Sequence, residues 1–416
     1  MTPEIISIVL LILMFVIATW RDVNMGFLGF IAAVALGAGV LGFDLDESLA
    51  GFPVDLFVTL VGLTYLFGFA QDNGAIDVIV RWAMRLVRGR LAIAPWIFFF
   101  LTAVLIALGA LFAVAIVAPL ALTFARRNGL NQFLTGLLVV HGALAGAFSP
   151  LSVYGVFISD YLNQSGFEND PLSLFLAPFL FNLVFATVTF LVMRRRPGPR
   201  AAGDADIEFT AEGPQRLTGF QTLTLVVLAA MAVSVIVVGW DIGIVSISLA
   251  VVLAFVNPAA GKAAMSRVSW SVVILISGVL TYIHVLQEAG TVDWVSQGIS
   301  AIGVPLLAAL LLFYMSGLVS ALASSLGIIG VVMALAGPFL ASGDVHVAGF
   351  VAALAIAATI VDISPFSTNG AMLLANVHSS VRDDYYRGML AYAGVMCAVG
   401  PGAAWLIAAV PTWAAG

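Results

Sequence analysis

Two segments far apart in the chain repeat a serine, a proline and a second serine in the same order. Residues 149–155 read Ser-Pro-Leu-Ser-Val-Tyr-Gly, and residues 364–370 read Ser-Pro-Phe-Ser-Thr-Asn-Gly. Proline removes a backbone donor and clashes with the preceding helical turn, while glycine lets the chain bend and approach a ligand closely. Because each segment lies in an apolar run, the pattern predicts a broken membrane helix that lines a binding site. The alternative is a proline kink whose hydroxyls cap local carbonyls.

The broken helices would supply hydroxyls, amides and helix-end partial charges for an anion and a cation. Asp362 lies two residues before the second segment, and an acid in an apolar run is costly unless it binds a cation or exchanges a proton. The long apolar segment 302–340 is expected to form a hairpin, and its serines either make polar contacts at the site or allow close helix packing. The candidate substrate- and ion-binding residues are Ser149, Pro150, Ser152, Gly155, Ser324, Ser325, Asp362, Ser364, Pro365, Ser367, Thr368, Asn369 and Gly370.

We expect no cofactor apart from a coupling ion, either sodium or a proton, and no tight metal site. A transient sodium ion would bind at Ser149, Ser152, Asp362 and Ser364. His141 and His284 either relay protons or are satisfied residues of the helix bundle. An intramembrane enzyme using Asp362 or a serine with one of these histidines is a remote alternative, since no nucleophile-elbow or zinc-ligand motif is present. We therefore expect a protein that is not an enzyme.

The composition restricts the kind of protein that can hold these residues. The chain has 416 residues, of which 62% are hydrophobic and 9% are charged. A membrane span needs about 20 apolar residues, so the chain has room for about ten spans. We expect an all-α polytopic membrane protein with the lipid bilayer as a partner and no role in binding nucleic acid.

The two halves of the chain also match elsewhere, which predicts an internal duplication. Gly62, Gln71, Gly74 and Asp77 recur 216 positions later, as Gly278, Gln287, Gly290 and Asp293. We predict a first membrane repeat at 1–193, a polar linker at 194–216 and a second repeat at 217–416. Each repeat reads as five crossings with a re-entrant hairpin and a broken helix. Because five is odd, the second repeat must be inverted in the membrane.

Charge placement gives an independent orientation. If the hairpin at 92–127 enters from the cytoplasm, all sixteen basic residues lie on the cytoplasmic side, as the positive-inside rule favours. The linker is then cytoplasmic, in a multi-pass protein of the cell inner membrane or plasma membrane.

At these positions the sequence resembles the ion transporter superfamily, and within it the MatC-type dicarboxylate carriers, relatives of the divalent anion/sodium symporters. The resemblance rests on the repeated Gln-Asp/Glu-x-Gly-x-x-Asp motifs, on Pro119 and Pro338 at the hairpin ends, and on the two broken segments. It implies a homodimer in which a transport domain carries a dicarboxylate with cations by an elevator-type movement. The related symporters have Ser-Asn-Thr at the hairpin tips, and neither tip has it here.

The sequence therefore predicts a secondary transporter of a small organic anion, a C3 or C4 dicarboxylate such as malonate or succinate, coupled to sodium or protons. A cation/proton antiporter or an inorganic anion permease on the same scaffold is the alternative.

Overall fold

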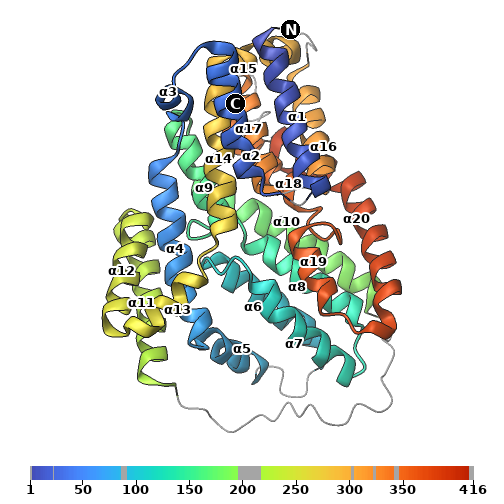
Figure 1. Ribbon diagram of the computed structural model, residues 1–416. Coiled ribbons are helices and arrows are strands. Elements are labelled where there is room, and N and C mark those ends of the chain that lie inside the picture. The colour runs from blue at the N-terminus through green and yellow to red at the C-terminus, as the bar shows by residue number, and fades with distance from the viewer. Residues whose placement is uncertain are drawn as a thin grey trace.

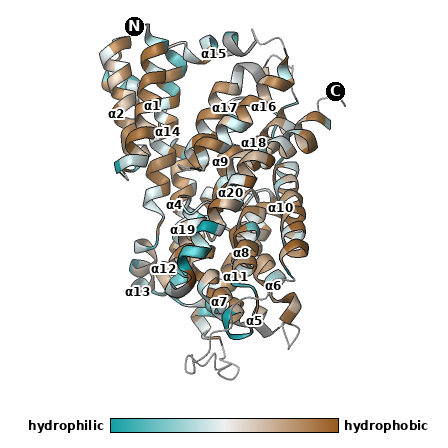
Figure 2. Ribbon diagram, turned by 90° about the vertical axis from the view of Figure 1, so that its right-hand side faces the viewer, coloured by the Kyte–Doolittle hydropathy of each residue, from teal (hydrophilic) through white to brown (hydrophobic). Residues whose placement is uncertain are grey.

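The computed structural model describes residues 2–21, 23–85, 91–194, 217–300, 304–321, 325–341 and 346–411. The described chain is helical throughout, as expected for an all-α membrane protein (Figure 1). Six of its helices are long and apolar enough to cross a membrane, and hydrophobic residues run along most of the helices (Figure 2). The predicted linker, apart from Arg194, lies outside the described residues.

The first half of the chain contains ten α-helices among the described residues. They are α1 Pro3–Arg21, α2 Met25–Leu36, α3 Leu45–Leu49, α4 Val54–Asp72, α5 Ala75–Arg85, α6 Ala94–Ala107, α7 Ala113–Arg127, α8 Gln132–Gly146, α9 Val153–Gln164 and α10 Pro171–Met193. A π-helical turn, η1 Gly37–Leu41, extends α2, and a 3-10 turn, η2 Leu91–Ile93, precedes α6.

The second half follows the same order. Its α-helices are α11 Gly219–Val233, α12 Ile242–Val256, α13 Pro258–Ser266, α14 Trp270–Glu288, α15 Thr291–Ser300, α16 Pro305–Ser320, α17 Ser325–Ala341, α18 Val347–Thr359, α19 Thr368–Ala375 and α20 Arg382–Ala404. Short turns complete it: η3 Ser234–Val238, η4 Ser379–Val381 and η5 Trp405–Ala409.

In two places a helix of the first half packs against a helix of the second half. The helix α14 packs on α2, with α1 beside them, whereas α4 packs on α12 near α11 and α13 (Figure 1). The repeated Gly62 and Gly278 lie at these two crossings. A Cβ at Gly62 would come within 2.8 Å of the Ser246 hydroxyl on α12, and one at Gly278 would collide with the backbone of Gly26 on α2. Small residues of this kind let membrane helices pack closely.

The second repeated glycine of the motif forms a turn. Gly74 follows α4 with a φ of 74°, and Gly290 follows α14 with a φ of 75°. Glycine adopts this left-handed conformation at little cost. The two turns direct the chain into α5 and α15, which lead on to the hairpins.

The hairpins and the interrupted helices lie together and pack against the outer groups around α2–α14 and α4–α12, with α17 against α14 and α9 against α4. The helices α6 and α7 form the first hairpin, and α16 and α17 form the second. Each hairpin packs against the first arm of its own interrupted helix, α8 or α18. Both α8 and α18 are buried over nearly their whole length, so the two interrupted helices form the centre of the protein.

Candidate functional site

The two broken segments adopt the same backbone structure. α8 ends at Gly146 and α9 begins at Val153, while α18 ends at Thr359 and α19 begins at Thr368. Ser152 and Ser367 are the N-caps of the second arms, with nearly equal dihedral angles (φ −93°, ψ 156° and φ −82°, ψ 161°). Their hydroxyls accept hydrogen bonds from the amides of Gly155, at 3.1 Å, and Gly370, at 3.3 Å. N-capping of this kind satisfies amides that a helix leaves without partners.

The same hydroxyls also donate to carbonyls of the segment that precedes the second arm. The Ser152 hydroxyl donates to the carbonyls of Ala147 and Ser149, and the Ser367 hydroxyl donates to those of Asp362, at 2.6 Å, and Ser364, at 2.7 Å. One serine therefore holds the two arms of each interrupted helix together. For Ser152 and Ser367 the structure therefore agrees with the alternative interpretation, in which the hydroxyls of the breaks cap local carbonyls.

The other serine of each break also uses its hydroxyl, and in the first break it reaches the neighbouring hairpin. The Ser149 hydroxyl donates to the carbonyl of Ala107 at the end of α6, at 2.7 Å, and accepts from the Leu151 amide. The Ser364 hydroxyl accepts from the Phe366 amide at 3.3 Å. Pro150 and Pro365 occupy the turns between the arms, where no helical hydrogen bond is lost. The predicted residues Ser149, Pro150, Ser152, Ser364, Pro365 and Ser367 thus build the breaks.

The Ser367 hydroxyl caps the Gly370 amide and bonds to two carbonyls, so its removal should destabilise the start of α19. We expect Ser367→Ala to lower the free energy of unfolding by about 1 to 2 kcal/mol, with Ser152→Ala giving a similar loss at α9. Thermal unfolding of the purified protein measures both. Ser266→Ala, whose exposed hydroxyl bonds only to the Ala263 carbonyl, is the matched control and should stay near the parent value.

A cavity of about 70 Å³ lies beside the breaks, between both halves of the chain. Its polar lining comes from Tyr154 on α9, Thr359 and Asp362 at the end of α18, and Thr368 and Asn369 in the first turn of α19. Its apolar lining consists of Ile106, Leu111, Phe112, Ala143, Leu144, Ala147, Val272, Leu275 and Leu326. The described lining contains one charged side chain, Asp362, and no basic one.

Asp362 is tied to the second hairpin. Its side chain is 3% exposed, and Oδ1 accepts a hydrogen bond from the Ser325 hydroxyl at 2.6 Å. Ser320 donates to Ser325 at 2.9 Å and to the Ala358 carbonyl at 2.5 Å. The hairpin serines therefore make polar contacts at the second break. Ser324, predicted beside them, lies outside the described residues.

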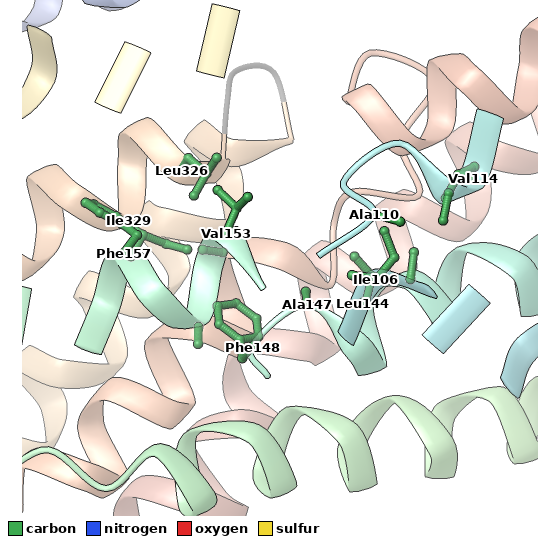
Figure 3. Close-up of a cluster of buried hydrophobic side chains, with 14 of the residues drawn as sticks. Ile106, Ala110, Val114, Leu144, Ala147, Phe148, Val153, Phe157, Leu326 and Ile329 are labelled. Atoms are coloured by element: carbon green, nitrogen blue, oxygen red, sulfur yellow. The ribbon is translucent and has the colours of Figure 1, made fainter. Parts of the chain in front are cut away.

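The first half presents a different surface at the corresponding place. Ala147 occupies the position that corresponds to Asp362, and Figure 3 shows apolar side chains from α6, α7, α8, α9 and α17 surrounding the first break. Ile106, Ala110 and Leu144 lie on one side of it, and Phe157 and Ile329 on the other. The polar groups of the cavity thus come mainly from the second half.

Three polar residues of this region were not among the predicted site residues. Tyr154 lines the cavity at the position that corresponds to Asn369, so the repeat itself carried the signal for it. Ser320 belongs to the serines of the second hairpin, for which polar contacts were one of the two interpretations, whereas Thr359 had no local signal, because a lone hydroxyl in an apolar helix usually bonds to its own backbone. Thr359 does so, with the Ala355 carbonyl at 2.7 Å.

The two histidines lie apart from the cavity. His141 is fully buried, with Nδ1 3.0 Å from Asn182 Oδ1 on α10 and Nε2 2.7 Å from the Tyr392 hydroxyl on α20. Tyr392 also bonds to Thr189 at 2.7 Å, so this network favours the interpretation of His141 as a satisfied bundle residue. His284 lies on α14 in a separate polar cavity with Asp55 and Asp160.

The two broken helices thus meet at a small, largely apolar cavity with one group of polar side chains. One comparison with known proteins bears on its use. Residues 1–147 match the family model of the dicarboxylate carrier protein MatC N-terminus. The match confirms the MatC resemblance over the first third of the chain. It ends before the first break, so both breaks and the whole second half lie outside it. No curated protein matches the chain significantly. The MatC match and the helical membrane fold point to a carrier and not to an enzyme.

Proposed function

We propose that this protein is a secondary active transporter of a small organic anion, a C3 or C4 dicarboxylate such as malonate or succinate. The observation that carries the proposal is the cavity at Asp362, where the two broken helices and the second hairpin converge. Broken helices of this kind are typical of transporter sites, because their ends supply partial charges at membrane depth. The MatC match over residues 1–147 supports a dicarboxylate as the substrate.

The lining explains how an anion and a cation would share the site. With no basic side chain in the described lining, the anion must be held by the first turn of α19, by Thr368 and Asn369, and by Tyr154. An ionised Asp362 would repel a dianion within a few ångströms. A bound sodium ion or a proton on Asp362 removes that repulsion, so we propose that cation and anion bind together.

The proposed movement is of the elevator type. The hairpins and interrupted helices would move as one domain against the groups around α2–α14 and α4–α12. The matching order of elements in the two halves, and the matching breaks, support two inverted repeats at 1–193 and 217–416. We further propose a homodimer in the cell inner membrane or plasma membrane, with the linker 194–216 on the cytoplasmic side.

Uptake into proteoliposomes tests this function. Radiolabelled malonate and succinate are offered with a sodium gradient and a proton gradient imposed separately. Uptake that follows one gradient would support a coupled dicarboxylate carrier and identify its ion. Absence of uptake under both gradients, with a folded and oriented protein, would contradict the proposal.

Because the only charge in the described lining is acidic, a cation/proton antiporter is the second candidate, together with an inorganic anion permease. Charge movement measured on a solid-supported membrane separates them. A current that requires a dicarboxylate supports the first function, and one that requires only a cation gradient supports the antiporter.

Asn369 offers a direct test of the anion site. We expect Asn369→Ala to raise the KM for the dicarboxylate by about 10- to 100-fold, because one hydrogen bond to a charged ligand is worth about 1.5 to 3 kcal/mol. Initial uptake rates over a range of substrate concentrations measure this change. Asn376→Ala is the matched control at the exposed end of α19, where Nδ2 bonds to the Met372 carbonyl, and its KM should equal that of the parent. Equal KM values for both variants would remove Asn369 from the site.

A further inference from the structure

A second cavity, separate from the transport site, opens on the outer surface of the helix bundle. It has a volume of about 540 Å³ and lies between α10 and η5, with α18 as its floor. On α10 its wall includes Leu172, Leu180 and Val184, whose exposed fractions are 63%, 54% and 57%. Ala352 on α18 is buried beneath them. The small side chains of α18 create the space, and Leu172, Leu180 and Val184 border it.

The polar groups of this groove are confined to one end. Asp170, the N-cap of α10, and His346, the N-cap of α18, lie at its mouth with Ser173. The hydroxyl and the amide of Ser173 hold the pKa of Asp170 below its usual range, so Asp170 places a carboxylate at the mouth at neutral pH. Beyond Ser173 the described lining is apolar.

The length of the groove matches one leaflet of a bilayer. Leu172 and Val184 are twelve residues apart on α10, which corresponds to about 18 Å along a helix. The hydrocarbon core of a bilayer is about 30 Å thick, so one leaflet is about 15 Å. An acyl chain that entered at the level of Asp170 would therefore extend along the groove to the level of Val184.

We propose that this groove binds one acyl chain of a phospholipid whose headgroup carries a primary amine, with the ammonium beside Asp170. The carboxylate attracts an ammonium and repels a purely anionic headgroup, which gives the site its selectivity. The lipid would cover the apolar surface between α10 and η5 and hold these elements against α18. This role goes beyond anion transport and does not depend on it.

Lipid binding to the full-length protein tests the proposal. The protein is washed free of lipid in mild detergent and incubated with equal amounts of phosphatidylethanolamine and phosphatidylglycerol of the same chain length. Native mass spectrometry then counts the retained lipids. We expect a preference for phosphatidylethanolamine with one molecule per chain. Asp170→Asn should reduce this occupancy at least about threefold, as expected for a partly screened ion pair.

Two further variants separate headgroup from acyl-chain recognition. Glu168→Gln removes a neighbouring exposed acid outside the groove and should retain the parent occupancy. Ala348→Phe places a ring at the mouth and should reduce retention of both lipids. Elution as a single peak in gel filtration verifies that each variant is folded.

Two results would contradict the proposed lipid site. Equal retention of the two lipids by the parent and by Asp170→Asn would mean that only annular lipid is bound. Efficient disulfide crosslinking between two chains carrying Leu180→Cys and Cys397→Ala, in native membranes, would mean that a second copy covers the groove. Either result overturns the lipid site.

Discussion

Asp362→Asn is expected to abolish gradient-driven uptake while leaving the protein folded. The substitution keeps the shape of the side chain and an oxygen that can accept from Ser325, which lies 2.6 Å from Oδ1 in the parent. It removes the negative charge, the only one in the described lining of the cavity. A neutral amide neither exchanges a proton at this depth nor attracts a sodium ion strongly. We expect initial rates under a gradient to fall by at least about a hundredfold, as for loss of about 3 kcal/mol of cation binding.

The experiment separates coupling from substrate binding. Counterflow of labelled dicarboxylate without an ion gradient should persist in Asp362→Asn, because the electrostatic repulsion is absent in the variant. Glu168→Gln, an exposed acid outside both the cavity at Asp362 and the groove on α10, is the acid-to-amide control and should keep the parent rates. Normal gradient dependence in a well-folded Asp362→Asn protein would refute the role of Asp362 and leave the coupling ion to bind at backbone carbonyls.

The local chemistry of the breaks could be predicted from the sequence because it depends on neighbouring residues. Proline and glycine act on the backbone within one turn, so Ser149–Gly155 and Ser364–Gly370 indicated the interruptions of α8–α9 and α18–α19. Asp362 was identifiable because ionisable residues are rare in apolar runs. The repeated Gly74 and Gly290 likewise indicated a shared turn.

The direction of each hydroxyl could not be predicted in the same way. A serine in a break can bond to its own backbone or face a cavity, and only the folded chain decides between these. Ser152 and Ser367 turn to the backbone, whereas Ser325 turns to Asp362. The His141 network joins residues 41 and 251 positions apart, and no local pattern indicates such partners. The sequence therefore identified the segments of the site more reliably than the atoms that line it.

Gly370→Ala is expected to have the largest effect on folding, because the glycine fixes the geometry of the second break. A Cβ at this position would collide with the carbonyl group of Ser364, coming within 2.6 Å of its carbon atom. The corresponding Cβ at Gly155 would come within 2.7 Å of the carbonyl carbon of Ser149. In both breaks the neighbouring atoms belong to the backbone and cannot rotate away. Relief requires the first turn of α19 to move from the Ser367 cap, which displaces Thr368 and Asn369 from the cavity.

We therefore expect Gly370→Ala to lower the free energy of unfolding by about 2 to 4 kcal/mol, the cost of forcing an atom into a packed interior plus loss of a cap. Uptake should be lost even in the fraction that folds. Thermal unfolding and uptake of the same preparation measure the two effects. Gly394→Ala on α20, where a Cβ meets nothing within 4 Å, is the matched control and should be neutral or slightly stabilising. Full uptake by Gly370→Ala would show that the backbone of the break can adopt another conformation without loss of function. The close approach of Gly370 to Ser364 would then have no part in forming the site.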